Sequence, residues 1–205
     1  MQRGKFIVLE GIDGSGKGSV GKMLASYLYD RAKSTHLFLT REPYDSPFLA
    51  EIRKLLKETS DPKENARQLA ELFVKDRKIH AEVISRHLEE GTHVICDRYK
   101  HSTLVFQQAQ GLSLNELIKM HDGVLTPDLT IILDVSEEVA LKRILGDSKR
   151  THLEVFERSE FLKKLRGLYL ALPGQLPKER IVVVDGDGTP EAVFARVRAE
   201  VDQLF

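Results

Sequence analysis

Near its start the chain reads Gly11-Ile12-Asp13-Gly14-Ser15-Gly16-Lys17-Gly18-Ser19, which follows the apolar run Phe6-Ile7-Val8-Leu9 and precedes a stretch of helical periodicity. Glycines at this spacing let successive backbone N–H groups turn inward, while the lysine and the next helix N-terminus add positive charge. The pattern GxxxxGK between a strand and a helix is typical of a loop that holds polyphosphate. We therefore expect ATP-side contacts from Gly11, Asp13, Gly14, Ser15, Gly16, Lys17, Gly18 and Ser19.

One position in this loop departs from the usual pattern. Ser or Thr normally follows the lysine and reaches Mg²⁺, whereas this chain has Gly18, and Ser19 is the nearest hydroxyl. The order Lys-Gly-Ser/Thr resembles that of adenylate kinases, which implies that a metal held through water suffices. We expect Mg²⁺ as the cofactor, with Asp97 and Ser19 as its candidate ligands, directly or through water.

The composition points to one α/β domain spanning residues 1–205. Lys plus Arg and Asp plus Glu both number 31, without a basic cluster, which argues against nucleic acid or an anionic membrane as the main partner. The single cysteine, Cys96, cannot form an intrachain disulfide, and no signal-like or membrane-length apolar stretch is present, so we expect a cytoplasmic protein. His80 and His87 are expected on the solvated surface of a long helix, not in a zinc site.

Short runs rich in β-branched residues alternate with helical stretches along the whole chain. Five of these runs predict strands, at Lys5–Glu10, His36–Thr40, His93–Cys96, Leu129–Asp134 and Ile181–Asp185. Their order predicts a five-stranded parallel sheet with both strand faces covered by helices, which is a P-loop NTPase fold with a short lid. Two apolar stripes are predicted to be buried, Val20-Leu24-Leu28 and Val193-Val197-Val201, and all seven prolines, Pro173 included, are expected in connections or at helix starts.

Ligands of an open parallel sheet gather at the carboxyl ends of its strands. After the third predicted strand comes Asp97-Arg98, in which the carboxylate can hold Mg²⁺ or its waters and the guanidinium can bind a phosphate. A strand-end Asp that caps the next helix beside a surface Arg is the alternative.

The stretch Ile95-Cys96-Asp97-Arg98-Tyr99, followed by Ser102-Thr103 and Val105-Phe106-Gln107, resembles the signature of thymidylate kinases, which phosphorylate dTMP with ATP. Further similarity runs in order from residue 7 to about residue 172. It includes the P-loop with Leu9 and Glu10, Thr40-Arg41-Glu42-Pro43, Glu51-Ile52-Arg53, Phe73-Val74-Lys75-Asp76-Arg77 and Pro127–Asp134. The Gly-Gly that usually follows the Arg-Glu-Pro turn is replaced by Tyr44-Asp45.

This resemblance implies roles for individual residues around the acceptor nucleotide. It implies that Asp13 faces the sugar 3′-hydroxyl, that Phe73 stacks on thymine and that Arg77 bonds a base carbonyl. The dTMP-binding residues that we expect are Asp13, Glu42, Arg53, Phe73, Arg77, Arg98, Ser102, Thr103, Phe106 and Gln107. Phe73 and Arg77 are four residues apart on one helix face, which also fits a core Phe beside a solvated Arg. The Phe106 ring is expected to disfavour ribose, and a pocket for the 5-methyl group would make dUMP a poorer substrate.

A basic stretch after the fourth predicted strand, Arg143–Thr151, contains a glycine and two adjacent cations, as a closing loop needs. We place the lid at about 146–152, with Arg143 on the ATP side. Gly14 resembles the bacterial-type enzymes, in which a lid arginine compensates for a P-loop Gly. The predicted catalytic residues are Lys17, Asp97, Arg98 and Arg150, with Arg143 and Lys149 as other candidates for the lid cation.

The resulting hypothesis is a dTMP kinase that transfers phosphate directly from ATP to dTMP, without a general base. One alternative is a kinase of another nucleoside monophosphate or of a nucleoside, and another is a P-loop switch protein without fast turnover. Family members are usually homodimers, so the resemblance implies a dimer.

Overall fold

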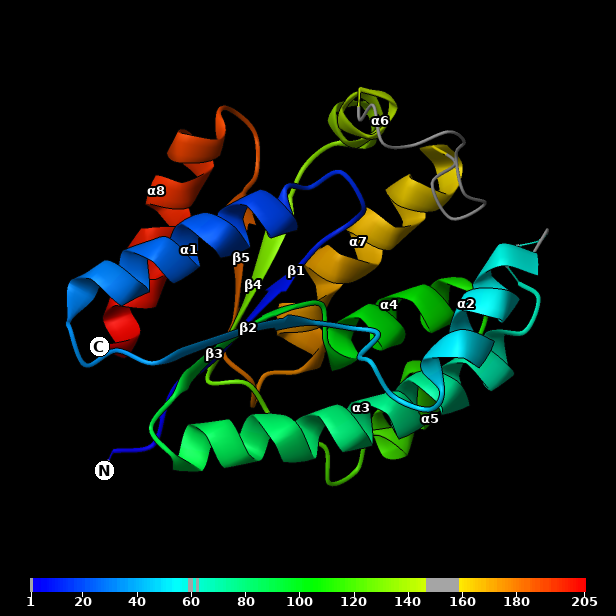
Figure 1. The fold of residues 1–205 in the computed structure, drawn as a ribbon. Coiled ribbons are helices and arrows are strands. Elements are labelled where there is room, and N and C mark those ends of the chain that lie inside the picture. The colour runs from blue at the N-terminus through cyan, green and yellow to red at the C-terminus, as the bar shows by residue number, and fades with distance from the viewer. Residues whose placement is uncertain (1, 59–60, 62, 147–158) are drawn as a thin grey trace.

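The computed structural model describes residues 2–58, 61, 63–146 and 159–205. Its centre is a five-stranded parallel sheet in the order β2-β3-β1-β4-β5 (Figure 1). The strands are β1 (Phe6–Glu10), β2 (Leu37–Arg41), β3 (His93–Asp97), β4 (Leu129–Asp134) and β5 (Ile181–Asp185). The helices of the described residues are α1 (Lys17–Arg31), α2 (Leu49–Glu58), α3 (Ala66–Glu89), α4 (Lys100–Ala109), α5 (Leu114–Met120), α6 (Glu137–Leu145), α7 (Ser159–Gln175) and α8 (Pro190–Val201), with a final 3-10 turn at Asp202–Leu204.

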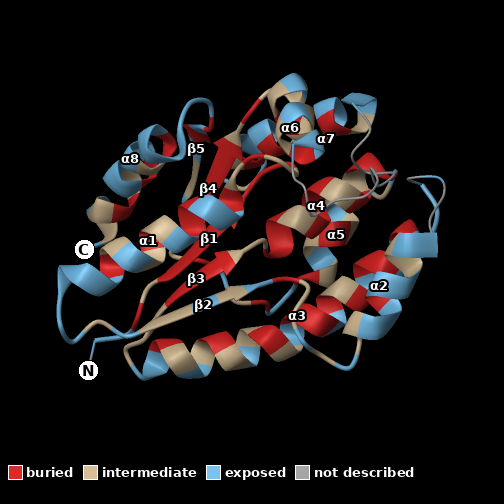
Figure 2. Cartoon of the chain, turned by 45° about the horizontal axis from the view of Figure 1, so that its top comes forward, coloured by how far each residue is buried: buried red, intermediate tan, exposed pale blue. Residues whose placement is uncertain are grey.

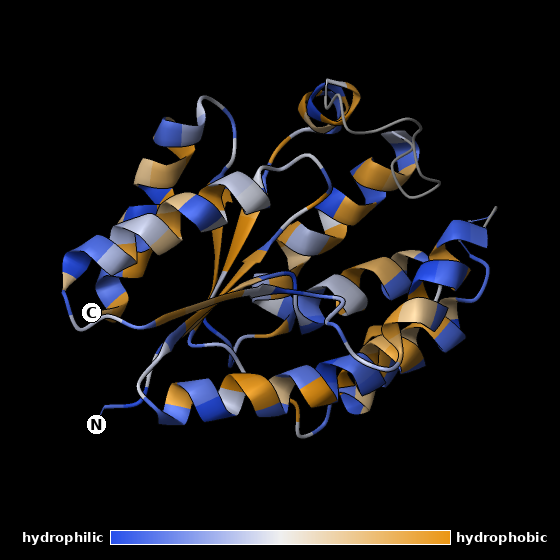
Figure 3. Cartoon of the chain, viewed as in Figure 1, coloured by the Kyte–Doolittle hydropathy of each residue, from blue (hydrophilic) through white to orange (hydrophobic). Residues whose placement is uncertain are grey.

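Strand β1 lies in the middle of the sheet and is buried along its whole length. It pairs with β3 on one side, where Ile7 is opposite Ile95, and with β4 on the other, where Ile7 is opposite Leu129. A central parallel strand has both faces covered, which explains why β1 is apolar from Phe6 to Leu9 (Figure 3).

Helices cover both faces of the sheet (Figure 1). Alternate residues of β1 point to opposite faces, so Ile7 and Leu9 pack in the core with α1 and α8, whereas Phe6 and Val8 pack with residues of α3. A third apolar cluster joins α4, α6 and α7 beside the C-terminal half of β4. The predicted stripes Val20-Leu24-Leu28 and Val193-Val197-Val201 are buried, which confirms that prediction (Figure 2).

All five predicted strands are present, and the predicted α/β class with a parallel sheet is confirmed. The prediction that helices cover both faces of β5 is wrong. This strand lies at the edge of the sheet, and its residue Val183 is 43% exposed. The placement of Pro173 was also wrong, since it lies inside α7. It stands two residues before the helix end, where the missing N–H removes only one hydrogen bond of the final turn.

The predicted surface position of two histidines on α3 is likewise wrong. His80 is completely buried, with its ring stacked on Tyr44 at 4.3 Å between centroids. His87 is half-buried and stacks on Phe38 of β2 at the same separation. Both lie on the side of α3 that faces β2 and the turn after it. The charged residues next to them in the sequence did not indicate that this side of the helix is covered.

The parallel arrangement brings the carboxyl ends of all strands to one edge of the sheet. The P-loop follows β1 at this edge, the Arg-Glu-Pro turn follows β2, and Arg98 follows β3.

None of the helices among the described residues is both long and apolar enough to cross a membrane.

Candidate active site

The P-loop wraps the N-terminus of α1, and its glycines occupy backbone conformations that other residues avoid. Gly14 has a φ of 79°, and a Cβ added there would come within 2.5 Å of the carbonyl oxygen of Ala140. Gly16, which precedes the first helical residue, has a φ of 96°. The loop therefore needs glycine at 14 for close approach to α6 as well as for its left-handed turn.

Lys17 is buried at the base of this loop. Its Nζ donates to the carbonyl oxygens of Gly11 and Ile12, each at 2.9 Å, and to Oγ of Ser15 at 3.3 Å. Burial, and then the positive charge of Arg98, lowers the pKa of Lys17 to about 8. The ammonium is thus held by neutral acceptors, which bind a cation more weakly than charged oxygens do.

A cavity of about 390 Å³ lies on the outer side of the P-loop. Arg143 of α6 crosses it and donates to the carbonyl oxygens of Gly14 at 3.4 Å, Gly186 at 3.1 Å and Gly188 at 3.4 Å. The cavity is lined by Gly14, Ser15, Gly16, Ser19, Val20, Arg143, Gly186, Gly188, Pro190 and Val193. The predicted ATP-side residue Arg143 therefore lies beside the P-loop, and the β5–α8 loop is a part of this site that the motifs did not reveal.

Arg98 lies at the opposite side of the P-loop and has a φ of 69°, which is uncommon for a residue with a side chain. Its Nη2 forms an ion pair of 2.6 Å with Oδ1 of Asp13, and its guanidinium carbon lies 5.3 Å from the ring centre of Phe106. Burial opposes the charge of Arg98, but Asp13 and the other nearby carboxylates raise its pKa above the ordinary value. Arg98 is therefore a permanent cation between the P-loop and α4.

A buried carboxylate, Glu10, is linked to Arg98 through two hydroxyl groups. Oε1 of Glu10 accepts from the backbone N–H groups of Tyr99 and Ser102 at 2.8 and 3.1 Å. Its Oε2 accepts from the hydroxyls of Ser102 at 2.7 Å and Tyr169 at 2.9 Å. Arg98 Nη1 in turn donates to both of these hydroxyl oxygens, at 3.0 and 3.3 Å.

The sequence motifs did not predict a role for Glu10 or Tyr169. Tyr169 comes from α7, far along the chain, and burial followed by Glu10 raises the pKa of its hydroxyl well above the ordinary value. It therefore stays protonated and donates. The sequence signal that could have revealed Glu10 is a charged residue at the end of an otherwise apolar central strand, which has to find donors.

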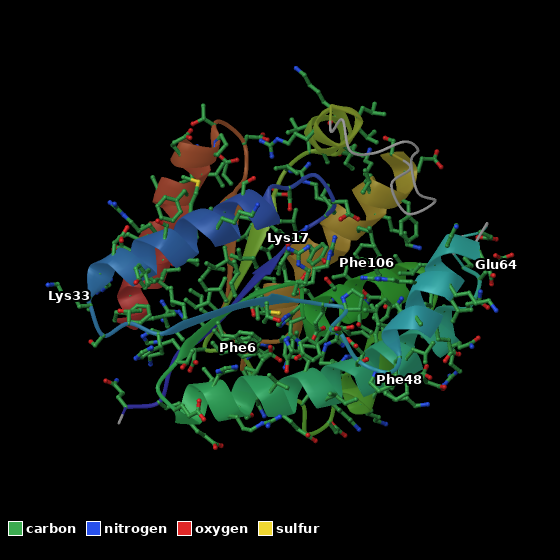
Figure 4. All side chains as sticks on the ribbon, in the orientation of Figure 1. Phe6, Lys17, Lys33, Phe48, Glu64 and Phe106 are labelled. Carbon is green, nitrogen blue, oxygen red and sulfur yellow. The ribbon has the colours of Figure 1, made fainter. Side chains whose placement is uncertain are left out.

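A second cavity, of about 160 Å³, opens beside Arg98. It is lined by Asp13, Glu42, Pro43, Leu56, Phe73, Arg77, Arg98, Tyr99, Ser102, Thr103, Phe106 and Gln107. The structure thus brings together every residue of the predicted dTMP set except Arg53, which is exposed on α2 and does not line it. Figure 4 labels Lys17 at the start of α1 and Phe106 on α4. Pro43, Leu56 and Tyr99 are lining residues that the motif reading did not assign.

Arg77 lies deep in this cavity and is only 2% exposed, so the alternative of a solvated arginine beside a core Phe is excluded. Its Nε and Nη2 donate to Oε2 of Glu42 at 2.7 and 2.6 Å. The other carboxylate oxygen of Glu42 contacts Nδ1 of His80 at 3.1 Å, and His80 Nε2 lies 2.9 Å from the Thr40 hydroxyl. This chain of contacts fixes the Arg-Glu-Pro turn against α3, with a cis bond between Glu42 and Pro43.

The segment after the Arg-Glu-Pro turn, where Tyr44-Asp45 replaces Gly-Gly, is bonded to α3 through Asp76. The backbone N–H of Tyr44 donates to Oδ2 of Asp76 at 2.8 Å, and the Ser46 hydroxyl donates to Oδ1 at 2.5 Å. Burial raises the pKa of Asp76 despite these two bonds. Asp76 thus joins the turn to the same helix that carries Phe73 and Arg77.

Two polar groups of α4 complete the inner end of the second cavity. Thr103 Oγ1 accepts from Arg77 Nη1 at 3.1 Å, which leaves its own hydrogen to donate. Gln107 donates through Nε2 to Gln110 Oε1 at 2.8 Å, while its Oε1 is buried without a hydrogen-bond partner among the described residues. The cavity therefore offers a hydroxyl donor and an amide acceptor near each other on one helix.

Asp97, the predicted metal ligand, ends β3 next to the P-loop. Its Oδ1 is buried and has no hydrogen-bond partner in the part of the chain that the structure describes. Its Oδ2 would lie 3.9 Å from a Cβ added to Gly18. A buried, unsatisfied carboxylate oxygen beside a phosphate loop fits Mg²⁺ or its bound water. Ser19 is exposed at the rim of the first cavity.

The predicted lid lies mostly outside the described residues. Lys149 and Arg150 fall there, and only Gly146 of the lid at about 146–152 is included.

Fold and site together define a P-loop phosphotransferase, with one cavity lined by the P-loop and Arg143 and a second lined by Asp13 and Arg98. Comparison with known proteins agrees, because residues 9–197 match the family model described as thymidylate kinase. The chain belongs to the thymidylate kinase family, and family membership assigns it the phosphorylation of dTMP.

Similar proteins cover nearly the whole chain. A probable thymidylate kinase of Pyrococcus horikoshii is 42% identical over 185 residues, which is 88% of each chain. Those of Methanococcus maripaludis and Archaeoglobus fulgidus are each 36% identical, over 98% of this chain and 96% of their own.

Proposed function

We propose that the chain transfers the terminal phosphoryl group of ATP to dTMP, with ATP in the cavity lined by Arg143 and dTMP in the cavity lined by Phe73. The observation that carries this proposal is that Arg98 and Asp13 are paired with each other, line the second cavity and lie close enough to Lys17 of the P-loop for their charges to act on it. The two substrates would thus meet beside two cationic side chains, Lys17 and Arg98.

Transfer between two phosphates needs charge neutralisation and alignment more than it needs a covalent or proton-transfer step. Lys17 and Arg98 are proposed to bind the donor and acceptor phosphates, and Arg150 of the lid to stabilise the transition state. Asp97 is proposed to hold Mg²⁺, which supplies positive charge to the phosphates of ATP when bound. The attacking phosphate oxygen is already ionised near neutral pH, so no residue has to act as a general base.

The second cavity, which we call the acceptor cavity because we propose that it holds dTMP, suits a base with a carbonyl oxygen next to an N–H group. Thr103 has a hydroxyl hydrogen to donate, and Gln107 Oε1 is an unpartnered buried acceptor. Thymine and uracil carry both complementary groups on one edge. Leu56 and Pro43 supply apolar surface in the same cavity, which supports a modest preference for the 5-methyl group of dTMP over dUMP.

The test is an ADP-release assay with Mg²⁺ and ATP across dTMP, dUMP, ribosyl TMP, AMP, CMP, GMP and thymidine. We expect turnover that is highest with dTMP. Gln107→Leu is expected to raise the KM for dTMP about tenfold by removing a buried acceptor. Gln108→Leu, at the next position of α4 and outside the cavity lining, is the matched control.

Two outcomes would redirect the assignment. Faster turnover with another monophosphate would retain the kinase and overturn the thymine pocket. Nucleotide binding without turnover on any acceptor would favour a P-loop switch protein.

We also propose a single domain, a homodimer and a cytoplasmic setting. The family resemblance supports the dimer, and the reduced, buried thiol of Cys96 supports the setting. Light scattering of the purified chain tests the dimer, since one chain per particle would contradict it.

A further inference from the structure

His121 follows the last residue of α5 and lies behind the acceptor cavity, with only 7% of its surface exposed. Its Nδ1 is 2.7 Å from the carbonyl oxygen of Leu117, and its Nε2 is 2.7 Å from Nη1 of Arg77. A carbonyl oxygen can only accept and a guanidinium can only donate. The imidazole must therefore carry its hydrogen on Nδ1 and accept through Nε2.

The electrostatic surroundings agree with a neutral ring. Burial, and then the charge of Arg77, lowers the pKa of His121 to about 3, with smaller effects in the same direction from Lys100 and His101. The bond to Leu117 acts in the opposite direction but does not offset them. Near neutral pH His121 is thus an acceptor for Arg77, not a second cation beside it.

This contact completes the hydrogen bonds of the Arg77 guanidinium. Its five N–H groups are shared among Glu42, the Tyr99 carbonyl, Thr103 and His121. Glu42 holds the edge formed by Nε and Nη2, while His121 holds Nη1 from the far side. The plane is therefore fixed from both ends, and Nη1 is directed at Oγ1 of Thr103.

We propose that His121 is a specificity-determining positioning residue for the base of the acceptor nucleotide. It fixes Arg77, and Nη1 of Arg77 in turn fixes Oγ1 of Thr103, so that the cavity is offered the Thr103 hydroxyl hydrogen beside a positive charge. A base with a carbonyl oxygen at that point can accept from the hydroxyl, whereas an amino group there would have to donate to an oxygen that already accepts from Arg77, so the carbonyl is favoured. The inference rests on the proposed function, because it takes the base to lie beside Thr103.

The test compares dTMP with dCMP, which has an amino group where thymine has a carbonyl oxygen. His121→Leu removes the acceptor and is expected to raise the KM for dTMP about tenfold and to lower the ratio of kcat/KM for dTMP to that for dCMP about tenfold. The KM for ATP should not change. His121→Gln, whose Oε1 can take the place of Nε2, is expected to restore most of the ratio, and His36→Leu, at an exposed histidine, is the matched control.

A merely structural role would reduce the active fraction of protein, which does not alter this ratio. An unchanged ratio in His121→Leu, or an equal loss in His121→Gln, would overturn the proposal. If wild type fails to use dTMP at all, the proposed function is at fault, not the role of His121.

A second measurement uses the wild-type protein and does not depend on the folding of a variant. Nitrogen-15 NMR of the His121 ring should show the hydrogen on Nδ1 near neutral pH. A hydrogen on Nε2, or a charged ring, would overturn the proposal, because neither form can accept from Arg77.

Discussion

Nη2 of Arg98 lies 2.6 Å from Oδ1 of Asp13, so the residue after β3 is bound to the loop after β1. The pair is only partly buried, with 18% of the Arg98 side chain and 30% of the Asp13 side chain exposed. The partly exposed carboxylate holds the guanidinium at the edge of the second cavity, where we propose that Arg98 binds the acceptor phosphate.

Arg98→Ala should reduce kcat/KM for dTMP by about 10²–10³-fold, since it removes a cation from the developing charge. Asp13→Asn should reduce it less, because the guanidinium remains. Steady-state kinetics measure both, with Arg67→Ala as a control, since Arg67 is exposed and pairs with Glu116 on the surface. Similar activity of Arg98→Ala and Arg67→Ala would contradict the role of Arg98.

Gly18 lies in the first turn of α1, where a Cβ has room beside Asp97. Gly18→Ala is expected to raise the free energy of unfolding by about 0.5 kcal/mol through reduced backbone freedom. Gly18→Ser should in addition lower the Mg²⁺ concentration that gives half-maximal activity, because it adds a hydroxyl next to the proposed metal ligand. Equal Mg²⁺ dependence of the two variants would refute the metal position.

The lowered pKa of Lys17 predicts how binding of an ATP analogue depends on pH. The side chain is mostly charged below about pH 8 and loses its proton above that value, so the dissociation constant should rise as pH increases past about 8. Calorimetry from about pH 7 to about pH 9.5 measures this. In Lys17→Arg, whose charge persists, the rise should be absent, and an identical rise would assign it to another group.

Glu179 makes an ion pair of 2.8 Å with Lys100 and a hydrogen-bond contact of 2.9 Å with Nε2 of His101. Burial raises its pKa, but these two partners together lower it from 4.5 to about 2. A lowered carboxyl pKa contributes stability that is complete above about pH 4.5 and is lost as pH falls towards about 2. Denaturant unfolding should therefore show a weaker pH dependence in this window for Glu179→Gln than for wild type, whereas Glu160→Gln, at an exposed glutamate of α7, should behave like wild type.

The sequence was sufficient to predict the strands, the P-loop and most of the residues that gather around the second cavity. These features rest on local patterns: apolar runs, glycines at fixed spacing, and polar residues at strand ends that a parallel sheet collects at one edge. The Phe73–Arg77 spacing also predicted a shared helix face, and both residues line the cavity.

Features that depend on distant partners could not be predicted in this way. The hydroxyl of Tyr169 meets Glu10 only because α7 packs across α4, and neither residue signals the other in sequence. His80 was predicted on the surface because its burial depends on the turn that contains Tyr44, which is distant in sequence. The exposed edge of β5 follows from strand order, which the apolar run Ile181–Val184 does not encode.

The central position of β1 has a consequence for the order in which the protein can fold during synthesis. The first strand to leave the ribosome pairs with β3 and β4, whose last residues are Asp97 and Asp134. Until Asp134 has been made, the apolar residues of β1 lack one of their two neighbours, so the nascent chain carries an unfinished sheet edge for more than half of its translation. A chain truncated before β4 should therefore bind chaperones or aggregate, because β1 would still have one open edge.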